Sequence, residues 1–455
     1  PKINYEGNIN AHKKNKEIMK NYKNLVPIGL VVFMGVGIYS VFANAATENS
    51  DYHAYLKKAR KDAKLEVIEE AVQYYGKALE LNDSIELRME VGELYADQGW
   101  TSEAIQWGES IIAKYPKESA GYEFLLKEYI EDEEYKDCFV LRDQAKARKA
   151  ESKKFDELMS KIDYVYEYGF DAYDDVSVYS NGWCAVKTED LWGYANEKGE
   201  TKITAEFAWA GPFSADEVAP VKSEKGEFYY ISDTGNKKIA LQNIKKCTDI
   251  GVSSNGILVA ADNEKYGYYD QNFKKIVGNY EYASAINGDI AAVKEGSKWK
   301  LIDAKGKVRG KDSYESVILD DKGIAFRNDR AFVEKADGYY LVDDKGKKIG
   351  KQKYEDARLF LEADGYAAVK VDGKWGFVDK TGKMVIEPQF ADAHSFANGY
   401  AAIKKNGKWG FIDENGEIVI RAQFEDARDF NDKGNVFVKD GTQWRLLELL
   451  RNNYK

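Results

Sequence analysis

The sequence predicts a multidomain protein with a single N-terminal transmembrane helix, a segment of α-helical hairpins and an all-β repeat domain. Three observations indicate this fold class. They are an uncharged apolar run near the start, apolar residues at helical spacing after it, and an aromatic residue that recurs every 33 to 40 residues over the rest of the chain. A chain of 455 residues is long enough for two or three domains. Its net charge of −10 argues against nucleic-acid binding, because phosphate contacts need a basic face.

Residues 25–46 are predicted to form a transmembrane signal-anchor helix after a basic cytoplasmic tail at 1–24. The run 25–42 is almost wholly apolar, and a helix of about 20 residues covers the roughly 30 Å hydrocarbon core of a bilayer. Lysines cluster before the run, so the positive-inside bias places the N-terminus in the cytoplasm and the later domains outside the cell membrane.

A cleaved signal peptide is the alternative to a retained anchor. Ala43-Asn44-Ala45 fits a small-residue cleavage site, and cleavage near Ala45 would release a secreted protein. The apolar run is longer than the usual h-region of about 7–15 residues, which favours the anchor.

The segment 52–165 is predicted to be helical and repetitive. Ala104 and Cys138 lie 34 residues apart, as do Tyr95 and Tyr129. This period and these residues resemble the tetratricopeptide repeat, a helix–turn–helix unit of about 34 residues. The resemblance implies a concave face that binds proteins or peptides; a rigid spacer is the equally open alternative.

The segment 166–450 is predicted to be an all-β repeat domain. Two copies share the motif Lys-Trp-Gly-Phe-[Ile/Val]-Asp-x-x-Gly, around Trp375 and Trp409. The recurring aromatic residues are Trp192, Phe228, Tyr266, Trp299, Tyr339, Trp375, Trp409 and Trp444. These copies resemble the bacterial WG β-repeat family, and the resemblance covers nearly two thirds of the chain.

Each copy is expected to contain about four short strands joined by turns. Large apolar side chains alternate along the segments that flank each Trp, and Asn-Gly or Thr-Gly pairs supply the turns. A second aromatic follows the first by 14 or 15 residues, as in Phe390 and Phe424. We interpret both aromatics as packing between units rather than as a sugar-binding ladder.

The two ends of the repeat region each carry half of a unit. If these halves pair, eight units close into a β-propeller that leaves no sheet edge exposed. About 36 residues is short for a four-stranded blade, so an open β-solenoid or hairpin stack is the alternative.

The residue types needed for most catalytic centres are scarce. The chain has three His and three scattered Cys, so it offers no catalytic triad, zinc site or disulfide framework. We expect no catalytic, metal or cofactor-binding residues and no cofactor. His394 is predicted to lie at the surface, and the cysteines are predicted to be small buried residues.

Departures from the repeat are better evidence of a ligand site than the repeat itself, and they cluster in units two to five. Exposed Tyr, Trp and Arg are enriched in binding hot spots. The irregular residues of these types are Trp209, Tyr229, Tyr230, Tyr268, Tyr269, Arg327, Arg330 and Tyr340. The ligand itself stays unknown at this stage.

The function expected from the sequence is that of a non-enzymatic, membrane-anchored interaction protein. Its WG-repeat domain would recognise a protein partner in the same membrane or, as a second choice, cell-wall glycan. The rival is an enzyme that acts on cell-surface polysaccharide through paired carboxylates in a propeller channel, since 77 acidic residues always offer pairs.

Overall fold

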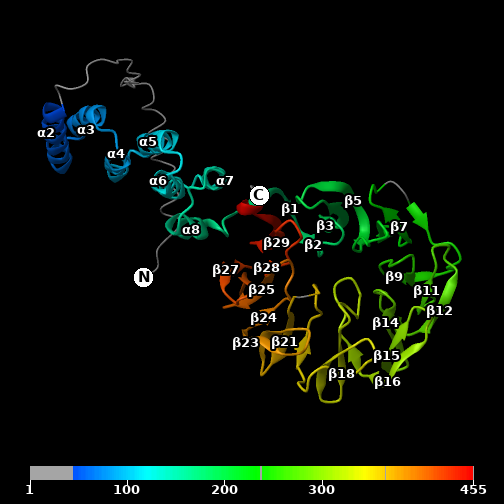
Figure 1. Cartoon of the computed structure of the whole chain (residues 1–455). Coiled ribbons are helices and arrows are strands. Elements are labelled where there is room, and N and C mark those ends of the chain that lie inside the picture. Colours follow the sequence, from blue (N-terminus) through cyan, green and yellow to red (C-terminus); the bar gives the residue numbers. More distant parts are fainter. Residues whose placement is uncertain (1–44, 236–237, 364, 454–455) are drawn as a thin grey trace. The chain divides into compact units, whose positions relative to one another are not determined.

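The computed structural model describes residues 45–235, 238–363 and 365–453. The chain divides into two compact units, with the boundary between Leu94 and Tyr95. The first unit contains α2, α3 and most of α4, and the second contains the other helices and the strands (Figure 1). The helices are α2 (Ala45–Lys64), α3 (Ile68–Leu81), α4 (Ile85–Asp97), α5 (Thr101–Lys114), α6 (Ser119–Glu131), α7 (Tyr135–Arg148), α8 (Lys153–Met159), the 3-10 turn η1 (Ser160–Ile162) and α9 (Leu450–Asn453).

The predicted transmembrane helix is the first correction. None of the helices in the described ranges combines the length and the apolar character needed to cross a bilayer. Where the predicted span enters these ranges, at Ala45 and Ala46, it becomes the start of α2, a helix rich in Lys, Asp and Glu. The rest of the span and the tail at 1–24 lie outside the described residues. The predicted single-pass membrane location is overturned by the same finding.

Helices α5 to α8 pack around one apolar core. Tyr122, Cys138 and Phe139 are fully buried in it. Helices α5 and α6 approach closely at Gly121, where a Cβ atom would lie 2.8 Å from a methyl group of Ile111. The resemblance of these helices to tetratricopeptide repeats stays a prediction.

The cysteines behave largely as expected. Cys138 and Cys184 are buried, and Cys247 is partly exposed. Burial raises the pKa of the Cys138 and Cys184 thiols to about 12, so both stay protonated at neutral pH.

The β domain consists of seven antiparallel sheets, and six of them are built from strands that are consecutive in the sequence. Four of the five four-stranded sheets contain consecutive strands. The first has β9 (Cys247–Ile250), β10 (Leu258–Asp262), β11 (Lys265–Tyr269) and β12 (Lys275–Tyr280), and the second has β13 (Tyr282–Ala283), β14 (Ile290–Glu295), β15 (Lys298–Asp303) and β16 (Val308–Tyr314). The third has β20 (Asp356–Ala357), β21 (Ala367–Val371), β22 (Lys374–Val378) and β23 (Met384–Phe390), and the fourth has β24 (Asp392–Ala393), β25 (Tyr400–Lys405), β26 (Lys408–Asp413) and β27 (Ile418–Phe424). A three-stranded sheet contains β17 (Ser316–Val317), β18 (Ala331–Lys335) and β19 (Gly338–Val342).

Two further sheets hold the remaining strands. One sheet has seven strands: β2 (Asp175–Val176), β3 (Cys184–Thr188), β4 (Leu191–Ala195), β5 (Thr201–Ala210), β6 (Val218–Ser223), β7 (Phe228–Ser232) and β8 (Lys238–Ala240). It spans two units because the long strand β5 pairs with both β4 and β6. The other joins the two ends of the domain: β1 (Tyr166–Tyr173), β30 (Gln443–Leu449), β29 (Asn435–Asp440) and β28 (Asp426–Ala427).

The half-units at the two ends of the β domain pair as expected, but the predicted closed ring without exposed sheet edges is wrong. Strand β1 pairs with β30, whereas an open solenoid or hairpin stack would keep these two ends apart. The strands nevertheless form open sheets rather than one closed barrel, and each sheet keeps two edge strands. The physical reason is that a hairpin unit satisfies most of its backbone hydrogen bonds internally, so neighbouring units meet through side chains and loops. The domain is therefore propeller-like.

The two recurring aromatics of a unit are partners across adjacent strands. Trp375 lies opposite Phe390, and Trp409 lies opposite Phe424. In the sheet that joins the chain ends, Trp444 lies opposite Tyr173, so the last unit takes its second aromatic from the start of the domain. These rings are buried, which confirms that they serve packing.

The glycine that follows Trp192, Trp375 and Trp409 permits a local bulge. Beyond the pair of Trp409 and Phe424, the next pair is Phe411 and Ile420, so β27 carries extra residues opposite Gly410. A Cβ atom on Gly410 would lie 2.6 Å from both the backbone N of Ala422 and the carbonyl oxygen of Ile420. Only glycine lets the bulged strand approach this closely.

We expect Gly410→Ala to destabilise the β domain by about 1–3 kcal/mol, because backbone atoms must shift to admit the methyl group. Urea unfolding followed by tryptophan fluorescence measures this loss. Gly76→Ala, in α3 with no atom within 4 Å of the added Cβ, is the control and should be neutral or stabilising by up to about 1 kcal/mol. Equal stability of Gly410→Ala and the wild-type protein would contradict the close approach.

Candidate functional site

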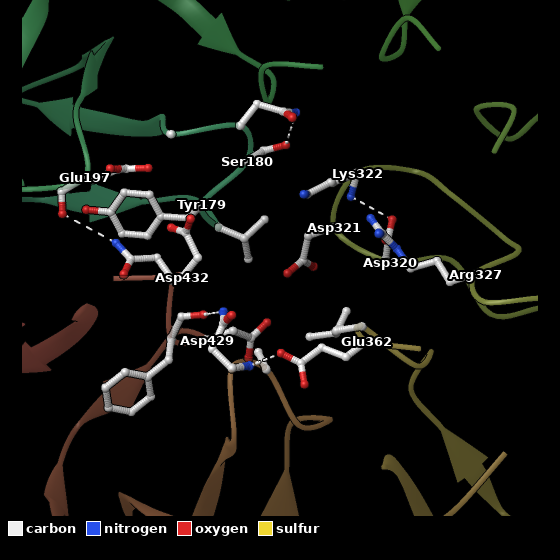
Figure 2. A pocket seen from close by; sticks show the side chains of 18 residues that line it. Tyr179, Ser180, Glu197, Asp320, Asp321, Lys322, Arg327, Glu362, Asp429 and Asp432 are labelled. Atoms are coloured by element: carbon white, nitrogen blue, oxygen red, sulfur yellow. Dashed lines mark hydrogen bonds and ion pairs between the residues drawn. The ribbon is translucent and has the colours of Figure 1, made fainter. Parts of the chain in front are cut away.

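Loops from five sheets of the β domain meet around a cavity of about 330 Å³. The loops are 178–182 after β2, 320–327 after β17, 361–362 after β20, 397–398 after β24 and 429–432 after β28, with Glu197 beside them. All five follow the first, very short strand of a unit, so the repeat itself brings them to one place (Figure 2).

Asparagine side chains join these loops from one unit to the next. The Nδ2 atom of Asn398 donates to the carbonyl oxygen of Phe430 at 2.7 Å, one unit further along the chain. Equivalent bonds run from Asn181 to Phe213, from Asn255 to Gly288, from Asn287 to Phe326 and from Asn328 to Phe360. We call these five side chains the Asn latches. The latches lie in a different turn from the predicted hairpin turn at Asn415-Gly416, whose Asn side chain bonds to Asp413 of its own turn.

Different contacts connect the last unit to the first. Asn431 and Asn435 both donate to the carbonyl oxygen of Glu197, at 3.4 and 3.2 Å. The Arg428 guanidinium donates twice to the carbonyl oxygen of Val176, at 3.1 and 2.9 Å. Residues more than 230 positions apart in the sequence therefore form one wall of the cavity.

The cavity is strongly acidic. Two of the charged side chains that line it are basic, Lys322 and Arg327. Six are acidic: Glu197, Asp320, Asp321, Glu362, Asp429 and Asp432. Because carboxylates outnumber cations three to one, the electrostatic potential inside favours a cationic group.

The loop after β17 is longer than its counterparts and supplies the centre of the cavity. Thirteen residues separate β17 from β18, against six between β13 and β14 and six between β24 and β25. The extra residues form a tight turn in which the Asp320 carboxylate accepts from the backbone N–H groups of Lys322 and Ile324, each at 2.9 Å. Arg327 forms an ion pair with Asp320 and fixes the turn. We call the segment 319–325 the inserted turn.

The two residues at the tip of the inserted turn point into the cavity. Figure 2 shows the Asp321 carboxylate directed toward Asp429 and Glu362, and the Lys322 side chain directed toward Ser180. Asp321 is reachable by solvent through the cavity, but the protein that surrounds it raises its pKa, and the Asp429 charge raises it further. Burial lowers the pKa of the Lys322 ammonium to about 8, and the Arg327 charge adds to this shift.

His394 contradicts the surface position predicted for it. Its side chain is only 15% exposed, its Nδ1 lies 2.8 Å from Oδ1 of Asp429, and its ring packs edge-on against Trp409. In the units on either side, Arg358 and Arg428 occupy the same position, each over the Trp of its own unit. His394 therefore belongs to a repeated structural contact beside the cavity.

The aromatic and basic residues that depart from the repeat differ in their exposure and in their distance from the cavity. Arg327 lines the cavity, and Trp209 and Arg330 remain partly exposed. The others are buried or half-buried within sheets: Tyr229, Tyr230, Tyr268, Tyr269 and Tyr340. Sequence reasoning missed the acidic residues of the cavity, although the unusual gap of 40 residues between Trp299 and Tyr339 was a signal for the inserted turn.

The groups at the cavity do not form an evident metal centre. In the ranges that the structure describes, no cluster of three or more His, Cys, Asp or Glu has an arrangement that could hold a metal ion.

We expect Asn398→Gly to lose about 1 kcal/mol of stability through the missing latch to Phe430. Asn406→Gly is the matched control, since both asparagines have φ of 53° in tight turns and the Asn406 side chain makes no hydrogen bond within the described residues. Both variants gain the same backbone freedom, so the difference between their urea midpoints isolates the latch. Equal midpoints would show that the latch contributes nothing.

Comparison with known proteins tests the predicted repeats. The model of the WG containing repeat matches residues 172–192, 192–226, 266–299, 341–375, 375–409 and 409–444. No curated protein matches the chain.

Comparison with solved structures finds remote similarities. The C-terminal WD40 domain of Sif2 shares 11% identity over 62% of this chain and 98% of that domain, with a TM-score of 0.43. Sqt1 of Saccharomyces cerevisiae shares 11% over 62% and 97%, with a TM-score of 0.38. Hsv2p of Kluyveromyces lactis shares 10% over 61% and 97%, with a TM-score of 0.37. The six family-model matches all lie in the β domain, so six segments of this domain are similar to the WG containing repeat.

Proposed function

We propose that this chain is a non-enzymatic interaction protein whose WG-repeat domain recognises a basic segment of a protein partner at the acidic cavity. The observation that carries the proposal is the convergence of six carboxylates from four loops on one cavity. A repeat scaffold with variable loops at one place is well suited to binding, because the loops can change without disturbing the sheets.

The size of the cavity defines what enters it. A volume of about 330 Å³ is at the low end of the range typical of ligand sites, so the cavity admits one or two side chains rather than a folded element. A lysine or arginine side chain of the partner would place its charge among the carboxylates and leave the rest of the contact to the surrounding loops.

Several of the carboxylates are already held in place. Glu362 accepts from the backbone N–H of Asn398, and Asp429 pairs with His394. Side chains fixed by such contacts lose little conformational freedom on binding, which favours affinity. The outward-facing oxygens of these fixed carboxylates are the proposed contacts for the cation.

The enzymatic rival rests on the same convergence of carboxylates. A glycosidase needs one carboxyl with a raised pKa beside one that stays ionised, and the raised pKa of Asp321 near Asp429 favours this second candidate. Hydrolysis of a cell-wall polysaccharide by the purified chain, abolished by Asp321→Asn, would establish the enzyme. Binding without turnover supports the interaction protein.

Crosslinking in intact cells with the full chain as bait, followed by mass spectrometry, tests the interaction. The variant Glu362→Gln with Asp432→Asn removes two cavity charges with little change of shape. We expect it to recover the wild-type partner at least about tenfold less well, because each lost charge contact costs of the order of 1 kcal/mol or more.

The control variant carries Glu224→Gln with Glu414→Gln, two exposed acids away from the cavity, and should recover the partner as well as the wild-type chain. Binding of the purified partner should also weaken as salt is raised. Equal recovery by the cavity variant, or recovery of glycan without protein, would contradict the proposal.

A further inference from the structure

One repeated position beside the acidic cavity carries a different residue in one unit. Arg358, His394 and Arg428 occupy this position in three successive units, and each lies over the Trp of its own unit. Each also contacts the neighbouring unit, Arg358 through Asp392 at 3.0 Å and His394 through Asp429 at 2.8 Å. The middle unit therefore keeps the contact but exchanges a guanidinium for an imidazole.

The exchange matters because the two side chains differ in how permanent their charge is. A guanidinium always carries its charge in a protein, whereas histidine side chains gain or lose theirs in the physiological range of pH. Of the two carboxylates contacted, Asp429 lines the cavity and Asp392 does not. The titratable member of the series is thus the one that contacts a carboxylate of the cavity.

The contact between His394 and Asp429 suits both charge states of the imidazole. An ionised carboxylate only accepts hydrogen bonds, so we assign the hydrogen of this contact to Nδ1 of His394. The second proton of the ring then binds or leaves at Nε2. Protonation therefore changes the charge beside Asp429 without breaking the contact.

The charges around His394 come from both sides of this contact. On the cavity side are Asp429, in contact with the ring, and Asp321, which is directed toward Asp429 (Figure 2). In its own unit, Asp392 pairs with the arginine of the preceding unit, and Nζ of Lys404 lies 5.6 Å from the centre of the Trp ring that His394 also contacts. The arginine that precedes Asp429 in the chain donates to the first unit instead. The nearest charge to a proton on His394 is therefore the Asp429 carboxylate.

We propose that His394 makes the binding of a basic segment at the acidic cavity dependent on pH, an inference that rests on the function proposed above. While the imidazole is neutral, Asp429 contributes its full negative charge to the cavity and the segment binds tightly. An imidazolium 2.8 Å away offsets that charge, so the segment binds less tightly. An arginine at this position, as in the two neighbouring units, would offset the Asp429 charge permanently.

Binding of an acetylated, dye-labelled octalysine peptide to the full chain tests the proposal, with fluorescence anisotropy measured from about pH 5.5 to about pH 8. The peptide keeps its charge over this range, because lysine side chains titrate near pH 10.4. We expect its dissociation constant to rise at least about threefold from the upper to the lower pH, since the imidazolium offsets one charge of the site. The variant Glu362→Gln with Asp432→Asn shows how much of the binding occurs at the cavity.

Two substitutions of His394 should have opposite effects on this binding. His394→Gln keeps a hydrogen-bond donor without a titratable charge, so most of the pH dependence should disappear and binding should stay tight. His394→Arg copies the neighbouring units and should bind the peptide at the upper pH as weakly as the wild-type chain does at the lower pH. His53→Gln, the same change at an exposed histidine of α2, is the matched control and should leave the pH profile unchanged. Thermal unfolding confirms that each variant is folded.

The wild-type chain supplies a second measurement that needs no folded variant at position 394. The chain has three histidines, so each imidazole of a ¹³C-histidine-labelled sample can be followed by NMR and assigned with the His53→Gln spectrum. We expect the His394 signal to titrate with the same midpoint as the binding of the peptide.

The outcomes separate the role of His394 from the function on which it rests. Equal binding of the peptide by the wild-type chain and the double cavity variant at the upper pH would contradict both. Binding at the cavity that is equally strong at both pH values would overturn the role of His394 alone. So would a pH dependence that His394→Gln leaves intact, or a His394 titration whose midpoint differs from that of binding.

Discussion

Contact between successive units is the constraint on which the rest of the β domain depends. A unit of three or four short strands cannot bury its own aromatic face, so its stability comes from the neighbour that covers it. The last unit faces the same requirement as the others. The chain meets it by pairing β1 with β30 and by bonding Arg428 and Asn431 to residues of the first unit.

The functional site is a consequence of that contact. The Asn latches hold the first loop of five units against the next unit, and the contacts between the last unit and the first bring loops far apart in the sequence to one cavity. Because the large buried side chains lie mostly in the sheets, a loop can lengthen at little cost to the fold. The inserted turn uses this freedom, and it adds Asp321 and Lys322 to a wall otherwise built from regular repeats.

The same repeated position serves different purposes in different units. Arg358 and Arg428 each lie over the Trp of their own unit and reach across to the next one. His394 replaces the arginine in the unit between them and contacts Asp429 at the rim of the cavity. A residue that breaks the repeat in sequence thus keeps the structural contact, so its rarity alone was a poor guide to its role.

The sequence by itself determined the units. The period, the two aromatics, the glycine after Trp and the Asn-Gly turns are local features, and the pairing of Trp409 with Phe424 follows from their spacing. Hydropathy predicted a transmembrane helix that extends to Ala46, whereas the polar helix α2 begins at Ala45. Only the tertiary structure decided which acids meet, because Glu197 and Asp432 become neighbours through pairing of the chain ends. The half-units at the two ends predicted this pairing, but spacing and composition do not show which side chains of the loops then meet.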